Sequence, residues 1–277
     1  MPVDWYNGGM EHTTLHLLYS RFVYKFLYDI GVAPTPEPYQ RRTSHGMVLA
    51  EDGRKMSKSF GNVINPDEIV QQYGADTLRC YEMFMGPFGE AIIWNTDGLK
   101  GVYRFLKKFW SLVINCADNQ KSSPDIIRAL HKLNKKIGED LEMMKFNTII
   151  SSFMEFVNLA SENEKEVGRD AIERLLILLF PFAPHTAEEI WERFGHKDSI
   201  SLEKWPGYNP KLAKEEVITL VIQVNGRVRD KIEVAADISE EEAKKLTLSR
   251  EKVKRWIERK EIKKVIFVPG KLINIVI

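Results

Sequence analysis

The chain has 277 residues, 44% hydrophobic and 29% charged, a composition typical of a soluble globular protein with room for several cores. Its formal net charge of +1 gives no overall signal for a nucleic-acid partner, so the distribution of charge matters more than the total. The two cysteines, Cys80 and Cys116, fall in apolar helical patterns and exclude a disulfide framework; without a long apolar run or an apolar leader, we expect a cytoplasmic protein with no membrane partner.

The segment after Gly8 and Gly9 reads as a helix, on which His12 and His16 share one face because they are four residues apart. Glu11 would lie at the helix start, where its carboxylate can accept bonds from ribose hydroxyls while the glycines let the backbone approach a ligand closely. Two alternatives stay open. The histidine pair could ligate zinc, although the order Glu-His-x-x-x-His has no third ligand close in sequence, or the two could be unrelated surface residues.

A proline-rich turn follows, and a short strand is predicted near Met47 to Leu49. One strand cannot form a sheet. The sequence therefore predicts an incomplete α/β segment whose remaining strands lie elsewhere, either in missing sequence or in another polypeptide.

Two ammonium groups and two hydroxyls stand within five residues in the segment Lys55-Met56-Ser57-Lys58-Ser59, which has a glycine nearby on each side. Such a loop can close over a polyanion such as a triphosphate, because ammonium groups stabilise negative charge that develops on a leaving pyrophosphate. Composition alone favours a solvated loop, because most runs of lysine and serine are solvated loops.

Two helices are predicted next. Asn65 is the expected N-cap of the first, with Pro66 at its first position, and Gly74 ends it. The second runs from Ala75 to about Met85 and carries Asp76 and Arg79. Their spacing favours a local ion pair over a catalytic pair.

The stretch from Trp94 to about Phe194 shows helical spacing of apolar residues throughout and predicts a bundle of about four helices. Turns are expected at Asp118 to Ser123 and near Glu162 to Val167. Two prolines in Leu179 to Glu189 predict a bend between helices, with His185 as a structural cap.

The last segment follows a linker predicted at Trp205 to Pro210. Strands at Val217 to Val224 and Lys231 to Val234 flank Asn225-Gly226, which is a strong hairpin signal. Ser239 begins a capping box, a basic helix is expected from about Arg250 to Lys260, and a second hairpin should turn at Pro269 to Lys271. Ten basic and three acidic residues lie between Ala243 and Lys264, which indicates either a solvated basic face or contacts to RNA phosphates. The candidate RNA-binding residues are Arg227, Arg229, Lys231, Lys254, Arg255, Lys263 and Lys264.

Several of these segments resemble class I aminoacyl-tRNA synthetases. The segment Lys55 to Ser59 resembles their KMSKS signature, and Gly46 to Arg54 before it is similar to the version in bacterial leucyl-tRNA synthetases. Further matching segments are Gly8 to Phe22, Tyr73 to Arg79, Leu179 to Glu189, Gln223 to Arg229 and Val268 to Val276. The resemblance covers nearly the whole chain. It implies a multidomain protein: part of a class I Rossmann-like catalytic domain in residues 1–93, an α-helical anticodon-binding-type bundle in 94–204, and a linker with a small α+β tRNA-binding domain in 205–277.

The resemblance also implies a leucine–tRNA ligase with ATP, in complex with Mg²⁺, and leucine as substrates and tRNA(Leu) as partner. It implies catalytic roles for Lys55 and Lys58 and a leucine pocket at His12 and His16, with no metal bound by this chain. The ATP-binding residues that it implies are Gly8, Gly9, Glu11, His12, Met47, Val48, Lys55, Met56, Ser57, Lys58 and Ser59.

Parts of such an enzyme are missing from the sequence, namely the H-I-G-H-like signature, the editing and zinc-bearing insertions and the first half of the catalytic sheet. We therefore expect the chain to be inactive alone and to need an N-terminal half, as the small subunit of a split enzyme or as a fragment of a longer one. Phe60 is a departure, because the family usually has a Lys or Arg after the signature. The alternatives are a stand-alone tRNA-binding module and a synthetase half for valine, isoleucine or methionine.

Overall fold

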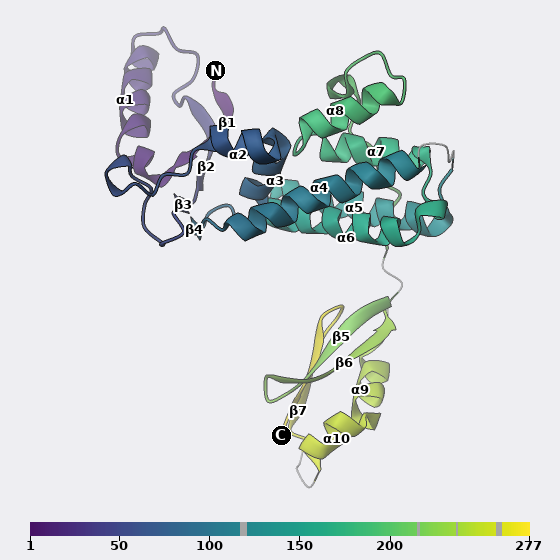
Figure 1. Ribbon diagram of the computed structural model, residues 1–277. Coiled ribbons are helices and arrows are strands. Elements are labelled where there is room, and N and C mark those ends of the chain that lie inside the picture. Colours follow the sequence, from purple (N-terminus) through teal and green to yellow (C-terminus); the bar gives the residue numbers. More distant parts are fainter. Residues whose placement is uncertain (117–120, 215–216, 237, 259–261) are drawn as a thin grey trace. The chain divides into compact units, whose positions relative to one another are not determined.

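A computed structural model describes residues 1–116, 121–214, 217–236, 238–258 and 262–277, with the backbone alone for 217 and 218 (Figure 1). The chain divides into two compact units, Met1–Ala213 and Lys214–Ile277. Each is described by itself.

The first unit begins with a strand–helix–strand element. Strand β1 (Val3–Gly9) pairs in parallel with β2 (Tyr39–His45), and helix α1 (His16–Asp29) connects them after the 3-10 turn η1 (Met10–Thr13). A helix follows Gly8 and Gly9 as predicted, but it starts later than expected, because the glycines end β1 and α1 begins only at His16 after η1. The prediction of a single strand in this region was wrong, because β1 and β2 are strands as well. The sequence did not indicate them, since they carry polar residues at positions where a strand pattern would have apolar ones.

Helix α1 is fixed to the loop before β2 by an ion-pair network. Glu37 accepts a two-pronged contact from Arg21, with a shortest N–O distance of 2.7 Å, and also pairs with Lys25. The Arg21 hydrogen bond, followed by that from Lys25, lowers the pKa of Glu37 to about 2. Tyr24 on the same helix is buried and bonds Thr35 at 2.8 Å.

A second parallel pair joins β3 (Val48–Leu49) to β4 (Ile92–Ile93), and the segment between them carries the loop with the two lysines. After the 3-10 turn η2 (Lys58–Phe60) come α2 (Pro66–Tyr73) and α3 (Ala75–Phe84). The predicted cap is confirmed, because the Asn65 side chain accepts the Asp67 N–H at 3.1 Å.

The bundle contains five α-helices among the described residues, where about four were predicted. They are α4 (Thr96–Cys116), α5 (Pro124–Glu142), α6 (Phe146–Glu162), α7 (Arg169–Leu179) and α8 (Pro184–Arg193), with short 3-10 turns η3 (Glu164–Glu166) and η4 (Ile200–Leu202). Phe109, Phe153 and Phe182 are fully buried in its core, as are both cysteines. Part of the predicted turn at Asp118 to Ser123 lies outside the described residues. None of the helices in the described ranges combines the length and apolar character needed to cross a membrane.

The segment predicted as a linker belongs to the first unit. The Pro206 carbonyl accepts a hydrogen bond from Asn134 at 2.7 Å, and the Asn209 N–H donates to His131 at 3.1 Å. Both partners lie on α5, so the Trp205 to Pro210 segment is held against the bundle.

The second unit is a four-stranded sheet with two helices, which Figure 1 shows from β5 onward. The strand order is β6 (Arg227–Ala235), β5 (Val217–Val224), β8 (Leu272–Val276) and β7 (Lys264–Val268), with β5 and β8 parallel. Both predicted hairpins are confirmed; Asn225 and Gly226 have φ of 49° and 76°, the left-handed values that such a tight turn requires.

Helices α9 (Glu240–Ser249) and α10 (Glu251–Ile257) cover one face of this sheet, with Val253 in the core beside Ile222 and Ile273. The Ser239 capping box is present as predicted. The predicted basic helix is shorter than expected, since α10 ends at Ile257 and the remainder up to Lys260 lies partly outside the described residues.

Candidate functional site

The loop that carries Lys55 and Lys58 starts as a tight turn from β3. Leu49 pairs with Lys55, and the Ala50 N–H donates to the Arg54 carbonyl at 2.9 Å. Asp52 closes the turn through a contact of 2.6 Å to Arg54. The backbone N–H of Arg54 and then its guanidinium hold the pKa of Asp52 below its ordinary value. The first lysine therefore leaves the sheet at a defined point.

Asn62 holds the middle of the loop from within. Its side-chain oxygen accepts the Ser57 N–H at 2.9 Å, and its side-chain nitrogen donates to the Lys55 carbonyl at 3.3 Å. The hydroxyls of Ser57 and Ser59 bond each other at 2.8 Å. Asn62 was missed by the sequence reasoning, because an asparagine after a glycine in a loop reads as an ordinary turn residue.

The loop turns its apolar residue, the partly buried Met56, toward the bundle and exposes its cations. Met56 packs against the bundle core, whereas Lys55 and Lys58 are exposed. Neither lysine forms an ion pair with any side chain in the described part of the chain. Two cations on a backbone fixed at Asn62 and Met56 are available to an anionic ligand.

Glu11 faces this loop from η1. The pKa of Glu11 lies below its ordinary value. The main cause is a hydrogen bond from its own backbone N–H to the carboxylate, and electrostatic attraction to His12, Lys55 and His45 adds to the effect. A Cβ atom at Gly9 would collide with the Glu11 carboxylate. The Glu11 carboxylate therefore occupies the space beside Gly9 and would have to move if residue 9 carried a side chain.

His12 and His16 do not share a helical face, because His12 lies on η1 and His16 is the first residue of α1. Their rings still lie near each other, with centroids 6.4 Å apart in an edge-to-face arrangement, and Tyr6 stacks on His16 at 5.6 Å. Within the described residues, no three side chains of the metal-ligating types gather closely enough to hold a metal ion.

A cavity of ≈ 530 Å³ opens beside η1 and β3, a size that suits a small ligand. It brings together three predicted site residues, Glu11, Met47 and Val48, and two that the sequence reasoning missed, Ser44 and His45. The remaining predicted nucleotide-binding residues do not line it. The Met47 carbonyl already accepts the Ile92 N–H at 3.0 Å, and the peptide groups of Val48 point to the opposite edge of β3 by strand alternation.

Asp76 and Arg79 do not pair with each other, so the prediction of a local ion pair was wrong. Asp76 accepts bonds from the start of α8, at Thr186 and His185, and Arg79 donates to carbonyls before that helix. His185 contributes its backbone N–H, and no side-chain capping bond of His185 is seen in this part of the structure. These contacts replace a local Asp76–Arg79 ion pair because the turn between α7 and α8 provides N–H and hydroxyl donors for Asp76 and carbonyl acceptors for Arg79.

The candidate RNA-binding cations of the second unit fall into two groups. Arg229 stacks over Trp256 at 3.4 Å, and Lys254 pairs with Glu251 at 2.9 Å, so both are engaged within the unit. A β-bulge between the pairs at Ile222 and Gln223 breaks the alternation along β6, which sequence periodicity does not reveal. The other candidates are exposed and form no ion pair in the described residues; they are Arg227, Lys231, Arg255, Lys263 and Lys264.

Family models match two regions of the chain. Residues 18–95 match the tRNA synthetases of class I (I, L, M and V), and residues 124–245 match the anticodon-binding domain of tRNA ligases. The whole chain is 47% identical over 277 residues to a leucine–tRNA ligase of Alkaliphilus oremlandii (strain OhILAs). The chain belongs to the leucyl-tRNA synthetase family. It spans 34% of the length of that relative, about a third, and corresponds to a C-terminal portion.

A solved structure of this family is similar over the whole chain. It is the leucyl-tRNA synthetase AgnB2 of Agrobacterium radiobacter K84 in a ternary complex with tRNA and LeuAMS, at 33% identity and a TM-score of 0.77, and the chain covers 38% of it. The resemblance stated from the sequence is confirmed at the level of family and fold class: part of a class I catalytic domain, a helical bundle and a small C-terminal sheet.

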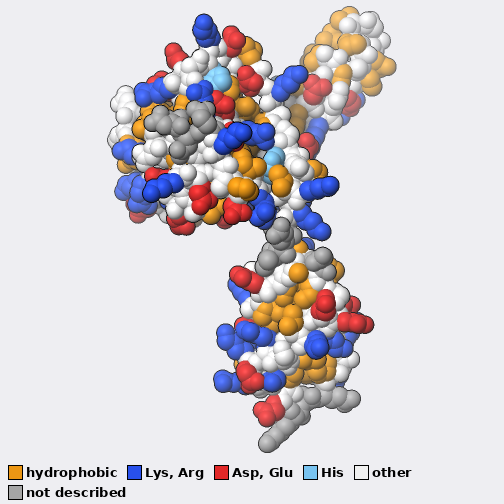
Figure 2. All heavy atoms as spheres, turned by 90° about the vertical axis from the view of Figure 1, so that its right-hand side faces the viewer, with side chains coloured by type: hydrophobic (Ala, Val, Ile, Leu, Met, Phe, Trp, Pro, Cys, Tyr) orange, Lys and Arg blue, Asp and Glu red, His pale blue; other side chains and the backbone are white. Residues whose placement is uncertain are grey.

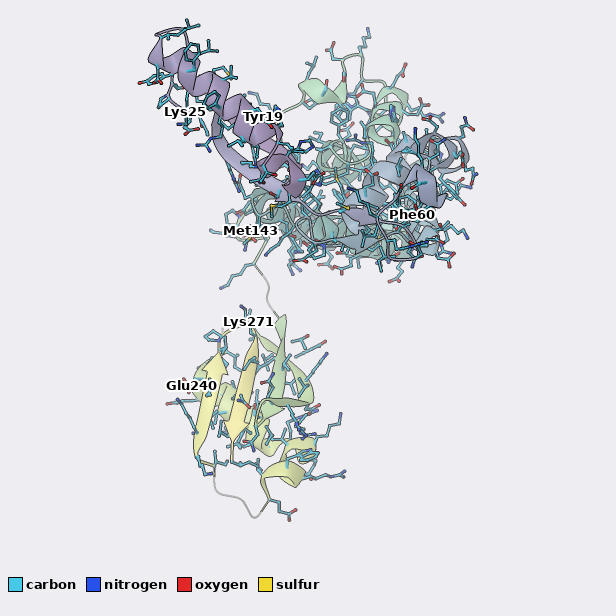
Figure 3. All side chains as sticks on the ribbon, turned by 90° about the vertical axis from the view of Figure 1, so that its left-hand side faces the viewer. Tyr19, Lys25, Phe60, Met143, Glu240 and Lys271 are labelled. Atoms are coloured by element: carbon cyan, nitrogen blue, oxygen red, sulfur yellow. The ribbon has the colours of Figure 1, made fainter. Side chains whose placement is uncertain are left out.

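Phe60 marks where this member of the leucyl-tRNA synthetase family departs from the usual signature. Its ring, labelled in Figure 3, is 60% exposed. The Arg54 guanidinium lies over it, 5.1 Å from the ring centroid. A cation–π contact of this kind holds a positive charge beside the loop. Arg54 thus lies close to Phe60, the position at which the resemblance led us to expect a basic side chain.

Proposed function

We propose that this chain supplies the KMSKS-loop portion of a leucine–tRNA ligase. In the complete enzyme a leucine carboxylate oxygen attacks the α-phosphorus of ATP, leucyl-adenylate forms and pyrophosphate leaves. The leucyl group then passes to the 2′-hydroxyl of the terminal adenosine of tRNA(Leu), and AMP leaves. The observation that carries the proposal is the pair of exposed lysines, without an ion-pair partner among the described residues, on a loop anchored by Asn62 and Met56.

Lys55 and Lys58 act as electrostatic catalysts in this proposal. Negative charge builds on the pyrophosphate as it leaves, and two ammonium groups beside it stabilise that charge more in the transition state than in the ground state. Ser57 and Ser59 hold the loop or donate to phosphate, and Met56 anchors it.

The ATP pocket is built from elements on both sides of the cavity. Gly8 and Gly9 allow close approach of the nucleotide, Glu11 accepts bonds from ribose hydroxyls, and the backbone at Met47 and Val48 contacts adenine. Magnesium arrives with ATP as part of the substrate. Next to this pocket, His12 and His16 contribute to the leucine site; their neighbouring rings support that assignment.

The exposed face of α1 favours a chain that completes a catalytic domain over a stand-alone tRNA-binding module. Leu17 and Tyr24 bury one stripe of the helix, whereas Leu18, Tyr19 and Phe22 lie on another stripe and are 58%, 65% and 75% exposed. Figure 2 shows hydrophobic side chains over much of the part of the molecule at its upper right, which contains α1, and Figure 3 shows Tyr19 on this helix. A helix that is apolar on two sides is normally buried on both.

The two parallel strand pairs support the same conclusion. Parallel sheets almost always contain more than two strands and are covered on both faces. Within the described chain, the β1–β2 sheet and the β3–β4 sheet each have only two strands. We infer that the remainder of a class I catalytic domain, which carries the H-I-G-H-like signature, covers α1 and extends these sheets.

Binding of tRNA is assigned to the bundle and the second unit. The bundle lies largely within the region that matches anticodon-binding domains. The five exposed cations without an ion-pair partner in the described residues (Arg227, Lys231, Arg255, Lys263 and Lys264) supply phosphate contacts, which position folded RNA without reading its bases. Arg229 and Lys254 can contact phosphates only if Arg229 leaves Trp256 and Lys254 leaves Glu251.

The experiment is leucine-dependent ATP–pyrophosphate exchange, measured with this chain alone and after mixing with a polypeptide that carries the missing portion of the synthetase. We expect exchange only in the mixture, with Lys55→Ala and Lys58→Ala each reducing it strongly. Lys165→Ala, an exposed lysine in the bundle, is the matched control and should leave exchange unchanged. A stoichiometric complex without exchange would refute the catalytic assignment. Valine, isoleucine and methionine in place of leucine test the amino-acid assignment.

A further inference from the structure

Helix α3 holds the turn between α7 and α8 at two points. The Asp76 carboxylate, on a residue only 6% exposed, accepts the Thr186 N–H and the Thr186 hydroxyl at 2.6 Å each and the His185 N–H at 3.3 Å. Arg79, one turn further along α3, donates to the Pro181 carbonyl at 2.9 Å and to the Phe182 carbonyl at 3.3 Å.

These contacts place each charge where the helix ends favour it. Helix α8 has Ala183 at its N-cap position and no side-chain cap from its own segment, so Asp76 takes that role from another helix. A carboxylate suits the positive N-terminal end of α8, and the Arg79 guanidinium suits the carbonyls that follow α7. Bonds to charged groups of this kind are stronger than neutral ones, and removing one partner leaves buried groups unsatisfied.

The same helix is tied to the lysine-bearing loop. Helix α2 follows the loop directly and α3 follows α2, with Gly74 alone between them. Ile64, Ile69 and Leu78 pack against the bundle core, as does Met56 within the loop. Helix α3 thus follows the signature loop in sequence and packs against the same bundle core as the loop does. It belongs to the region matched by the class I model, whereas α7 and α8 belong to the anticodon-binding region.

We propose that Asp76 and Arg79 are positioning residues for the adenylation step. By clamping α3 to the turn before α8, they fix the base of the signature loop and hence the place of Lys58 relative to the phosphates. This inference rests on the function proposed above. It assigns to the α3–α8 contact a role in catalysis without any contact to substrate.

A loop displaced by a weakened clamp has a specific kinetic signature. The lysine charges matter most when charge develops on the leaving pyrophosphate, so the loss should fall on kcat for exchange and leave KM for ATP and leucine nearly unchanged. Misplacement of a catalytic group by about 1 Å costs up to about a hundredfold. Asp76→Asn puts an N–H₂ group or a weaker acceptor against the two donors of Thr186, and we expect a loss of about tenfold in kcat.

The test is a double-mutant cycle in the assembled enzyme. If Asp76 acts through Lys58, Asp76→Asn costs about tenfold in the wild-type background and almost nothing further in a Lys58→Ala background. A purely structural residue would lower the activity of both backgrounds by the same factor. Asp140→Asn is the matched control, because Asp140 is also a buried carboxylate, 7% exposed, that accepts a 2.6 Å bond from a threonine, Thr148. It should lower the melting temperature and leave kcat unchanged.

Each outcome decides something. Equal losses in both backgrounds, or an unchanged kcat for Asp76→Asn in an active wild-type complex, overturn the positioning role and leave the proposed function standing. Absence of exchange by the wild-type complex overturns the function itself. Should Asp76→Asn fail to fold by circular dichroism, Thr186→Val replaces it in the cycle. It removes only the hydroxyl donor and is expected to show a smaller loss that is likewise absent in the Lys58→Ala background.

Discussion

Removing the side chain of Asn62 tests whether the signature loop is pre-organised by its internal hydrogen bonds. Asn62→Ala deletes the bonds to the Ser57 N–H and the Lys55 carbonyl. At a net value of about 1 kcal/mol each, their loss costs about 2 kcal/mol of loop ordering, which corresponds to roughly thirtyfold in rate if the ordered loop is needed only in the transition state. Leucine-dependent pyrophosphate exchange by the assembled enzyme measures the loss, which should appear in kcat.

The control is Asn163→Ala, which removes a single bond of 2.8 Å to the Leu159 carbonyl at the end of α6 in the bundle. Its exchange rate should equal that of the wild type. If Asn62→Ala exchanged within twofold of the wild type while the control did the same, the loop would not depend on these bonds, and the argument that it is held ready for phosphate would be wrong.

Three further outcomes are expected. Phe22→Asp with Phe26→Asp, at positions 75% and 57% exposed, should leave the circular dichroism of this chain unchanged and weaken its binding to the N-terminal portion in a titration. Because the pKa of Glu37 is lowered in the folded state to about 2, it contributes stability that is fully present well above its unfolded value near 4.5 and is lost as pH falls from there toward 2; Glu37→Gln should flatten the pH dependence of unfolding in that window. Arg227→Ala with Lys231→Ala should weaken tRNA binding and reduce its salt dependence, whereas pyrophosphate exchange, which needs no tRNA contact there, should be unchanged.

Local signals in the sequence predicted much of the fold. The Asn65 cap, the Asn225-Gly226 turn and the Ser239 capping box each act over four residues or fewer, and each is found as predicted. Such features are decided by neighbouring residues, so a single sequence contains the information they need. The bundle was predicted for the same reason, since its apolar spacing is set by burial along each helix.

Features decided by distant residues were missed. Asp76 and Arg79 have the spacing of a local ion pair, and the turn before α8 attracts both of them instead. In each case a partner that only the folded chain brings close decides the outcome, and one sequence does not identify that partner.

The candidate site follows the same division. The cations Lys55 and Lys58 were identified from residue type and from the resemblance, whereas the reason they have no ion-pair partner in the described part of the chain is structural. The loop backbone is fixed by Asn62, and the partly buried Met56 packs against the bundle core, so the lysine side chains are left on the exposed side. Fixing a charged loop before its ligand arrives lowers the ordering cost at the moment of reaction. For this reason we expect the Asn62 and Asp76 variants, which change neither lysine side chain, to lower kcat in the same way as removal of a lysine side chain does.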